Sequence, residues 1–312
     1  MSIIYIVMNK NYKIVEKIGN GSYAKIYKVK IDSEYYALRK QKFIKSDIKN
    51  FTKIIKNDKD ILDNTDKVLY KIIYFNKFIN KINDNHFDKL YNYKISKDNF
   101  KQIISQTFLD ELHPGIKDWI KNKLIKSNYC FETITDLKDD TLASMYKNKR
   151  WNNNNEKYSM VIQIIYALYL MHSNNFYHTD LHWKNIMYKK TNIKSIKILN
   201  FNVPTFGYIW TIIDYELIQS PLFKYLDSER RRLFIYRNLA YEDFMMFFFN
   251  SFCYDDTFIL ERITNNIKLS DKEIKKYFLE LKYYEDAKIF FEYAANNDHI
   301  KIIKYFNSKI IK

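Results

Sequence analysis

The sequence has few of the residues that interrupt or crosslink a chain. Its 312 residues include 4 glycines, 3 prolines and 2 cysteines. Cys130 and Cys253 lie outside any Cys-x-x-Cys or Cys/His spacing, which excludes a disulfide framework and a zinc site as organising features. We therefore expect an intracellular protein in a reducing compartment.

Long apolar runs are also missing. The longest strongly apolar stretch, residues 244–253, is interrupted by Asn250 and Ser251 and is shorter than the roughly 20 residues that cross a bilayer. Residues 1–8 are apolar, but they have neither a basic segment nor a small-residue cleavage site, which argues against a signal peptide. We expect a soluble protein without a membrane partner.

Acidic residues are outnumbered by basic ones. There are 52 Lys and Arg against 36 Asp and Glu, a formal net charge of +16, and such a charge attracts polyanions. Lysine, asparagine, isoleucine and tyrosine are nevertheless all abundant, which is the bias of AT-rich codons. We attribute much of the charge to this bias and do not expect nucleic acid as a partner. The hydrophobic fraction of 47% is enough for one large or two smaller packed lobes.

The first part of the chain shows two kinds of periodicity. Residues 12–42 alternate apolar and polar side chains around a glycine turn, which predicts three antiparallel strands. From 46 to 126 apolar residues recur at helical spacing, which predicts a long helical insertion. Residues 128–133 then have the pattern of a short strand.

The second part of the chain is predicted to be mostly helical. Residues 156–173 carry apolar side chains along one face and end at two asparagines, the pattern of a buried helix. Short strands are predicted at 186–188, 196–199 and 211–213. We therefore expect an α+β fold with a β-rich lobe at 1–135 and an α-rich lobe at 136–312, divided near Asp136.

Three short segments have the composition of a phosphoryl-transfer site. IGNGSYAKI at 18–26 places Gly19 and Gly21 in a hairpin whose backbone can close over phosphates. YHTDLHWKN contains Asp180, which can orient a hydroxyl group, and Asn185, which can bind a cation. TIIDYE ends a strand with Asp214, a hard oxygen ligand. Taken singly, each segment also fits an ordinary turn or helix cap.

Together and in this order, the segments resemble the protein-kinase signature set. HTDLHWKN followed by DYE is similar to the haspin-like kinases and to kinases of large DNA viruses. The resemblance implies a bilobal protein-kinase-like fold with a small N-terminal lobe, and ATP and Mg²⁺ as cofactors. It also implies a location in the cytoplasm or nucleus of a host cell or in a virion.

The resemblance assigns roles to residues. Asp180 would be the catalytic base, Asn185 and Asp214 would bind Mg²⁺, and His178 would pack against the metal-binding loop. Ala37 and Ile26 would sandwich the adenine, and the backbone of 131–134 would be the hinge that pairs with it. The residues implied for nucleotide binding are Ile18, Gly19, Gly21, Ile26, Ala37, Arg39, Lys40, Glu132 and Ile134.

Several positions depart from the kinase pattern. Arg39 stands where the phosphate-binding lysine is usual and Lys40 follows it; alternation sends Arg39 to the face of Ala37 and Lys40 to the other face, unless a bulge shifts the register. Thr179 replaces the arginine that receives an activating phosphate, which predicts constitutive competence.

Other departures lie on and after the catalytic loop. His182 replaces a catalytic-loop lysine. Lys184 either supplies that charge as a catalytic residue or is an ordinary solvated lysine, and Glu216 replaces the glycine of the metal motif. Beyond the loop, an extra hairpin is expected near 200–207.

Three further features allow two interpretations each. Asp243 either braces the catalytic loop or is a solvated acid. Glu111 is the nearest candidate for the glutamate of the third helix, although it also fits a surface position. Residues 291–306 resemble the helix pair of an ankyrin repeat, but a single repeat cannot bury its own face, so we favour a terminal helix pair packed on the large lobe.

Three functions are compatible with these segments. The first is a serine/threonine protein kinase with a protein substrate, which would be basic if the likeness to haspin extends that far. The second is a small-molecule phosphotransferase of the aminoglycoside or choline kinase type. The third is a nucleotide-binding pseudokinase, which Arg39 and the uncertain helix glutamate would favour.

Overall fold

The computed structural model describes residues 12–20, 24–43, 68–97, 129–148, 150, 151, 153–223, 239–252 and 284–310. The architecture is α+β, with an antiparallel sheet in the N-terminal region and a helical C-terminal region. The chain divides into two compact units, Met1–Asp60 with Asp88–Lys138, and Ile61–Phe87 with Asp139–Lys312. The division after Lys138 lies close to the expected boundary, but Ile61–Phe87 belongs to the second unit and not to the first lobe.

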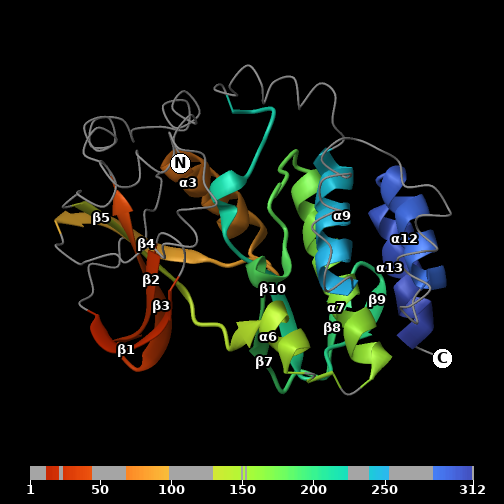
Figure 1. The fold of residues 1–312 in the computed structure, drawn as a ribbon, viewed down its shortest axis with the longest axis horizontal. Coiled ribbons are helices and arrows are strands. Elements are labelled where there is room, and N and C mark those ends of the chain that lie inside the picture. The colour runs from red at the N-terminus through yellow and green to blue at the C-terminus, as the bar shows by residue number, and fades with distance from the viewer. Residues whose placement is uncertain are drawn as a thin grey trace. The chain divides into compact units, whose positions relative to one another are not determined.

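The first unit contains a five-stranded antiparallel sheet (Figure 1). Its strands are β1 (Lys13–Asn20), β2 (Ala24–Ile31), β3 (Glu34–Phe43), β4 (Leu90–Lys97) and β5 (Tyr129–Asp136), in the order β1-β2-β3-β5-β4. The three strands predicted for 12–42 are confirmed. Alternating apolar residues form them because side chains on successive positions point to opposite faces.

The predicted helical insertion is only partly correct. Helix α3 (Val68–Ile82) lies within it, but β4 also lies within it and pairs with β5 along its length. The helical prediction for Leu90–Lys97 is therefore wrong: LYNYKISK has the alternation of an edge strand, and pairing with β5 satisfies its backbone. Residues 46–67 and 98–126 of the insertion, including Glu111, lie outside the described residues.

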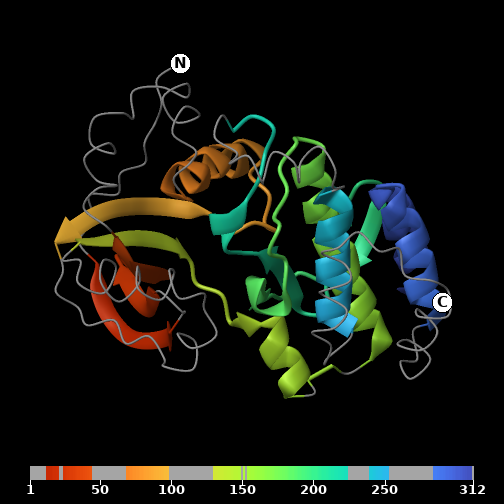
Figure 2. The same cartoon turned by 45° about the horizontal axis from the view of Figure 1, so that its top comes forward.

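Helix α7 (Asn154–His172) forms the centre of the second unit and confirms the helix predicted at 156–173. The side chain of Asn153 accepts a hydrogen bond from the Glu156 N–H and caps the first turn. Helices α9 (Leu239–Phe252) and α13 (His299–Ile310) pack against α7, and α12 (Tyr284–Ala295) packs against α9 and α13 (Figure 2). Phe290, Ile302 and Phe306 are buried in the core of this unit. The C-terminal helix pair is therefore an integral part of that core.

Small sheets complete the second unit. β6 (Asp140–Thr141), β7 (Ile186–Lys190) and β10 (Tyr208–Ile212) form one sheet, and β8 (Ser195–Ile198) pairs with β9 (Phe201–Pro204). The β8–β9 hairpin is the insertion expected near 200–207, displaced by a few residues. Among the residues that the structure describes, no helix is long and apolar enough to cross a membrane.

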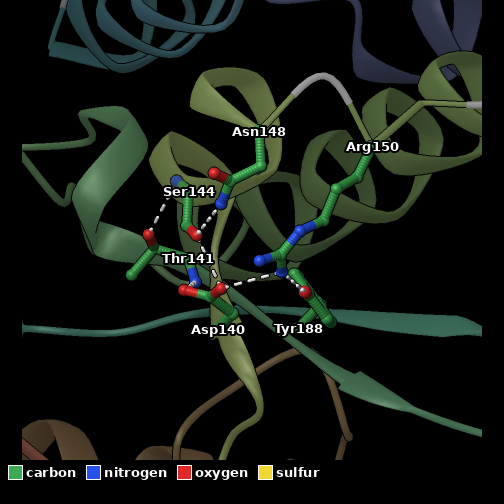
Figure 3. Close-up of polar contacts among 6 residues, drawn as sticks. All are labelled: Asp140, Thr141, Ser144, Asn148, Arg150 and Tyr188. Atoms are coloured by element: carbon green, nitrogen blue, oxygen red, sulfur yellow. Dashed lines mark hydrogen bonds and ion pairs between the residues drawn. The ribbon is translucent and has the colours of Figure 1, made fainter.

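Asp140 fixes the start of helix α6 (Leu142–Lys147) to the strand β7 (Figure 3). Its Oδ2 accepts hydrogen bonds from Ser144 Oγ at 2.6 Å and from Arg150 Nη1 at 3.1 Å. The same Arg150 nitrogen donates to the hydroxyl group of Tyr188 on β7 at 3.3 Å. Because β7 begins directly after Asn185, this cluster supports the strand that leaves the candidate site.

Candidate functional site

The loop 177–185 connects α7 to β7 and contains Asp180 and Asn185. Asn185 lies in a short 3-10 helix (Trp183–Asn185) and is buried. Its Nδ2 donates to the backbone oxygen of Asp180 at 2.9 Å and to Asp180 Oδ2 at 3.2 Å. Both hydrogen bonds are donated by the amide nitrogen of Asn185, so the amide oxygen, Oδ1, takes no part in them and points away from these two contacts. The loop therefore fixes the carboxylate and the amide oxygen relative to each other.

Asp214 follows β10, the strand that pairs with β7. The Ile213 N–H donates to the backbone oxygen of Asn185 at 2.9 Å, and Asp214 has a left-handed backbone with φ 64°. Burial raises the pKa of Asp180, and the negative charge of Asp214 adds to this rise. The second unit thus brings together in one constellation Asp180, Asn185 and Asp214, the residues that the second and third motifs supply.

His178 links the loop to the strand before Asp214. It is fully buried, and its Nε2 lies 2.9 Å from the backbone oxygen of Ile213. A carbonyl oxygen only accepts, so Nε2 carries the hydrogen, and Nδ1 accepts the Asp180 N–H at 3.3 Å. This geometry confirms the structural strut predicted for His178.

Asp243 on α9 binds the backbone of the loop. It is fully buried, and its carboxylate accepts hydrogen bonds from the backbone N–H groups of His178 at 2.8 Å and Thr179 at 2.7 Å. Charge-assisted bonds of this kind are stronger than neutral ones. The bracing interpretation of Asp243 is therefore confirmed, and the solvated one is wrong.

Thr179 connects the loop to the segment after Asp214. Its Oγ1 donates to the backbone oxygen of Leu217 at 2.7 Å, and its φ is 58°. Next to it, Tyr177 and Gln219 exchange two backbone hydrogen bonds, of 3.0 and 2.8 Å. Thr179 thus makes a direct contact with the segment that follows Asp214.

His182 faces the Asp180 carboxylate. His182 Nδ1 accepts the Lys184 N–H at 3.1 Å, so Nε2 carries the hydrogen and lies 3.8 Å from Asp180 Oδ2. Burial lowers the His182 pKa, against the opposing effect of the Asp180 charge. Lys184 is exposed. The signal for His182 was its position two residues after Asp180, within one tight turn.

The first unit separates the nucleotide-binding residues expected from the sequence into two groups. Ile26 pairs with Arg39 in the ladder between β2 and β3, so both lie on one face with Ala37. Gly19 pairs with Ile26, and Ile18 is 45% exposed beside it. Gly21 lies outside the described residues.

Lys40, Glu132 and Ile134 lie on the opposite face of this sheet. Lys40 Nζ is 3.3 Å from Glu132 Oε1, and the Tyr12 hydroxyl donates to Glu132 Oε2 at 2.6 Å. Ile134 packs with Val29, Ile31 and Leu38 in a small core. Lys40, Glu132 and Ile134 therefore do not share a face of the sheet with Arg39, Ala37 and Ile26.

The expected hinge at 131–134 does not fit the strand pairing. These residues lie inside β5 and pair with β3 on one side and β4 on the other. A central strand uses its backbone groups in both ladders, so none remains for an adenine base. The strand ends at Asp136, and a hinge would have to follow it.

The donor atoms of the constellation fit Mg²⁺. Asn185 Oδ1 and the Asp214 carboxylate are hard oxygen ligands, and Mg²⁺ is commonly held by one or two such groups together with substrate phosphates and water. The described parts of the chain contain no group of three or more His, Cys, Asp or Glu residues placed to hold a metal ion. The fit therefore rests on an amide, a carboxylate and a bound nucleotide.

No family model matches this chain, and a search of curated proteins gives no significant match.

Proposed function

We propose that this protein is an ATP- and Mg²⁺-dependent serine/threonine protein kinase with a bilobal kinase-like fold. The main support is that Asn185 Nδ2 is bonded to Asp180 while the Asn185 backbone oxygen is bonded to Ile213, the residue before Asp214. One loop and one strand end thereby hold a general base and two cation ligands together. Phosphoryl transfer needs mainly positioning and charge stabilisation.

Each residue of this site has a distinct proposed role. Asp180 orients the acceptor hydroxyl group and takes its proton, while the hydrogen bonds from Asn185 hold the carboxylate in place. Asn185 and Asp214 would bind Mg²⁺, which neutralises charge on the transferring phosphoryl group when it is bound. His178 and Asp243 fix the loop, so its geometry does not depend on the substrate.

The first unit would contribute Arg39 as the phosphate-binding residue. Arg39 lies on the same face as Ala37 and Ile26, the pair proposed to sandwich the adenine. Arginine presents a forked, planar set of donors that suits phosphate. Helix α3 contains no acidic residue, so it does not supply the glutamate that pairs with the strand lysine in kinases.

Activity is proposed to be independent of phosphorylation. The bond from Thr179 Oγ1 to the Leu217 oxygen already ties the catalytic loop to the segment after Asp214. An arginine at this position would instead need a phosphate partner.

Replacement of Asp180 tests the proposal. The Asp180→Asn protein should transfer label from ATP to mixed acceptors about 10² to 10⁴ times more slowly than wild type. ATP with Mg²⁺ should still raise its thermal unfolding temperature, because the cation ligands remain. Glu292→Gln, at an exposed position on α12, is the matched control and should leave transfer unchanged.

The choice of acceptor separates the competing functions. Labelling of casein or histone supports a protein kinase, whereas labelling of choline or an aminoglycoside supports the small-molecule phosphotransferase. Nucleotide binding without transfer in wild type would indicate the pseudokinase. Equal transfer by wild type and Asp180→Asn would remove Asp180 from the mechanism.

A further inference from the structure

Two histidines connect the C-terminal helix pair to Asp243. His172 is the last residue of α7, and His299 is the first residue of α13. His172 Nδ1 lies 2.8 Å from His299 Nε2, and His172 Nε2 lies 2.9 Å from Asp243 Oδ2. Asp243 in turn accepts the two backbone hydrogen bonds that hold the catalytic loop. A continuous chain of hydrogen bonds therefore runs from α13 to this loop.

The hydrogen on His299 can be placed from its neighbours. His299 Nδ1 lies 2.9 Å from the backbone oxygen of Asn297. Because a carbonyl oxygen only accepts, Nδ1 of His299 carries the hydrogen. In the neutral ring the other nitrogen, Nε2, is then an acceptor, and the hydrogen between the two rings belongs to His172 Nδ1.

The second nitrogen of His172 also carries a hydrogen. It faces the Asp243 carboxylate, which is acceptor-only when ionised and already receives the N–H groups of His178 and Thr179. His172 therefore donates from both nitrogens and is an imidazolium ion paired with Asp243. A buried pair of this kind is stable only when its remaining hydrogen-bonding groups are also satisfied.

We propose that His299 is a positioning residue for the catalytic loop, which accepts a hydrogen bond from the His172 imidazolium and so holds the His172–Asp243 pair beneath the loop. The activity part of this inference rests on the proposed kinase function; the hydrogen-bonding part does not. A helix that is far from Asp180 in the sequence thereby contributes to the geometry of the loop.

The surroundings favour a neutral His299. Burial and the positive charge of His172 lower the pKa of His299 to about 3, against the opposing effects of the Asn297 carbonyl, Asp298 and Asp243. The other polar groups around the two rings are Tyr169 on α7 and Tyr177 on the loop, whose rings lie 5.8 Å from His299 and 5.4 Å from His172. Phe244 on α9 covers His299 with a centroid distance of 4.7 Å. His299 thus remains an acceptor at neutral pH.

Three variants of the full chain separate this role from general support of α13. His299→Gln retains an acceptor at the end of a side chain of similar length, and His299→Leu removes it. Tyr305→Phe is the control on the same helix, because it deletes the hydrogen bond from Tyr305 to Asp286, of 2.7 Å, and leaves the two histidines unchanged. Amide hydrogen exchange over 176–185 measures the loop, and ¹⁵N NMR of the six histidines measures the protonation of His172.

The expected result is a loss of protection confined to the loop. In His299→Leu the loop amides should exchange at least about tenfold faster, the effect of losing roughly 1.4 kcal/mol, while His299→Gln and Tyr305→Phe should behave like wild type. In wild type the NMR spectrum should show a hydrogen on both ring nitrogens of His172, as the contacts to His299 and Asp243 require. Phosphoryl transfer should fall through kcat in His299→Leu and recover in His299→Gln.

The inference is overturned if His172 in wild type is a neutral ring, or if loop exchange in a folded His299→Leu protein equals that of wild type. The NMR result decides the matter should His299→Leu fail to fold. Because exchange and NMR need no ATP, they stand even if no phosphoryl transfer is found, which would count against the proposed function alone.

Discussion

At the scale of single residues, the environment of Asp180 determines its proton affinity. Burial raises its pKa, and the neighbouring His182 and His178 oppose this rise, while the charge of Asp214 adds to it. The carboxylate must be ionised to take a proton from a hydroxyl group. Activity should therefore fall on the acid side at a higher pH than an ordinary aspartate would give.

Replacing His182 should shift the fall of activity on the acid side to a still higher pH. His182 Nε2, which carries a hydrogen, lies 3.8 Å from Asp180 Oδ2 and lowers the pKa of Asp180. We expect the pH dependence of kcat/KM in His182→Gln to shift up, by at most roughly 0.7 pH unit, which is the value for a full charge pair of about 1 kcal/mol. Lys184→Gln, which changes an exposed side chain on the same loop, is the control; a shift in both variants, or in neither, contradicts this role for His182.

Asp88 in the first unit gives a second prediction, on stability. Burial raises its pKa to about 7, although Lys138 and Arg39 act in the opposite direction. Between the ordinary value of 3.8 and about 7 the folded state holds a proton that the unfolded state has lost. The contribution of Asp88 to the free energy of unfolding therefore decreases as the pH rises through this window.

Urea unfolding of wild type and Asp88→Asn measures this contribution. The amide cannot ionise. The unfolding free energy of wild type should therefore decrease relative to that of Asp88→Asn as the pH rises from about 5 to about 8. Titration of every other group, His299 included, cancels in this difference. A difference that is constant with pH would show that Asp88 titrates alike in both states.

The site residues divide into those that a motif identifies and those that only packing identifies. Asp180, Asn185 and Asp214 were predictable because each follows a recognisable pattern at the end of a helix or strand. The contact between His182 and the Asp180 carboxylate was not predictable, because charge alone does not tell which of two side chains in a tight turn faces a carboxylate. That choice depends on the hydrogen bond between the Lys184 N–H and His182 Nδ1.

At the scale of elements, the two faces of β3 carry different residues: Arg39 lies on one face, and Lys40 with its partner Glu132 lies on the other. Alternation correctly separates Arg39 from Lys40, and the sequence did not show that Glu132 is the partner of Lys40. Glu132 is 3% exposed and also contacts Lys94 Nζ at 3.2 Å. A buried carboxylate loses stability when a cationic partner is removed.

We therefore expect Lys40→Ala and Arg39→Ala to have opposite effects on stability and on ATP binding. Lys40→Ala should lower the free energy of unfolding by about 1 to 3 kcal/mol, because Glu132 loses one of its partners, with little effect on the affinity for ATP. Arg39→Ala should weaken ATP binding by more than it lowers stability. Urea unfolding and ATP titration of both proteins measure this, and the reverse assignment of effects would indicate that the nucleotide uses the Lys40 face.

The strands and helices were predictable where one periodicity was dominant. Helix α7 and the strands of 12–42 have uninterrupted patterns and were found within a few residues. Strand β4 was not, because the helical spacing of isoleucine and phenylalanine before it, in α3, extended the helical prediction across it. Its edge position depends on pairing with β5, which comes more than thirty positions later (Leu90–Lys97 against Tyr129–Asp136).

At the scale of the whole molecule, membership of a compact unit does not follow chain order. The apolar side of α3 predicts a helix, but not its partner. Phe75 of α3 lies 4.6 Å from the ring of Tyr215 and 5.0 Å from that of Phe176. These contacts place α3 in the second unit with the residues around Asp214, an outcome that periodicity cannot supply.

The terminal helices provide the last prediction. Phe306 on α13 is 1% exposed and contacts Tyr158 of α7, with ring centroids 5.6 Å apart. Removing such a side chain from a core costs about 3 to 5 kcal/mol, and for a protein of this size each kcal/mol lowers the midpoint by roughly 2 to 4 °C. Phe306→Ala should therefore lower the main thermal transition by about 6 °C or more, whereas Ile300→Ala, at a position 40% exposed, should change it little. An independent repeat would instead give a separate early transition in Phe306→Ala, with the main transition unchanged.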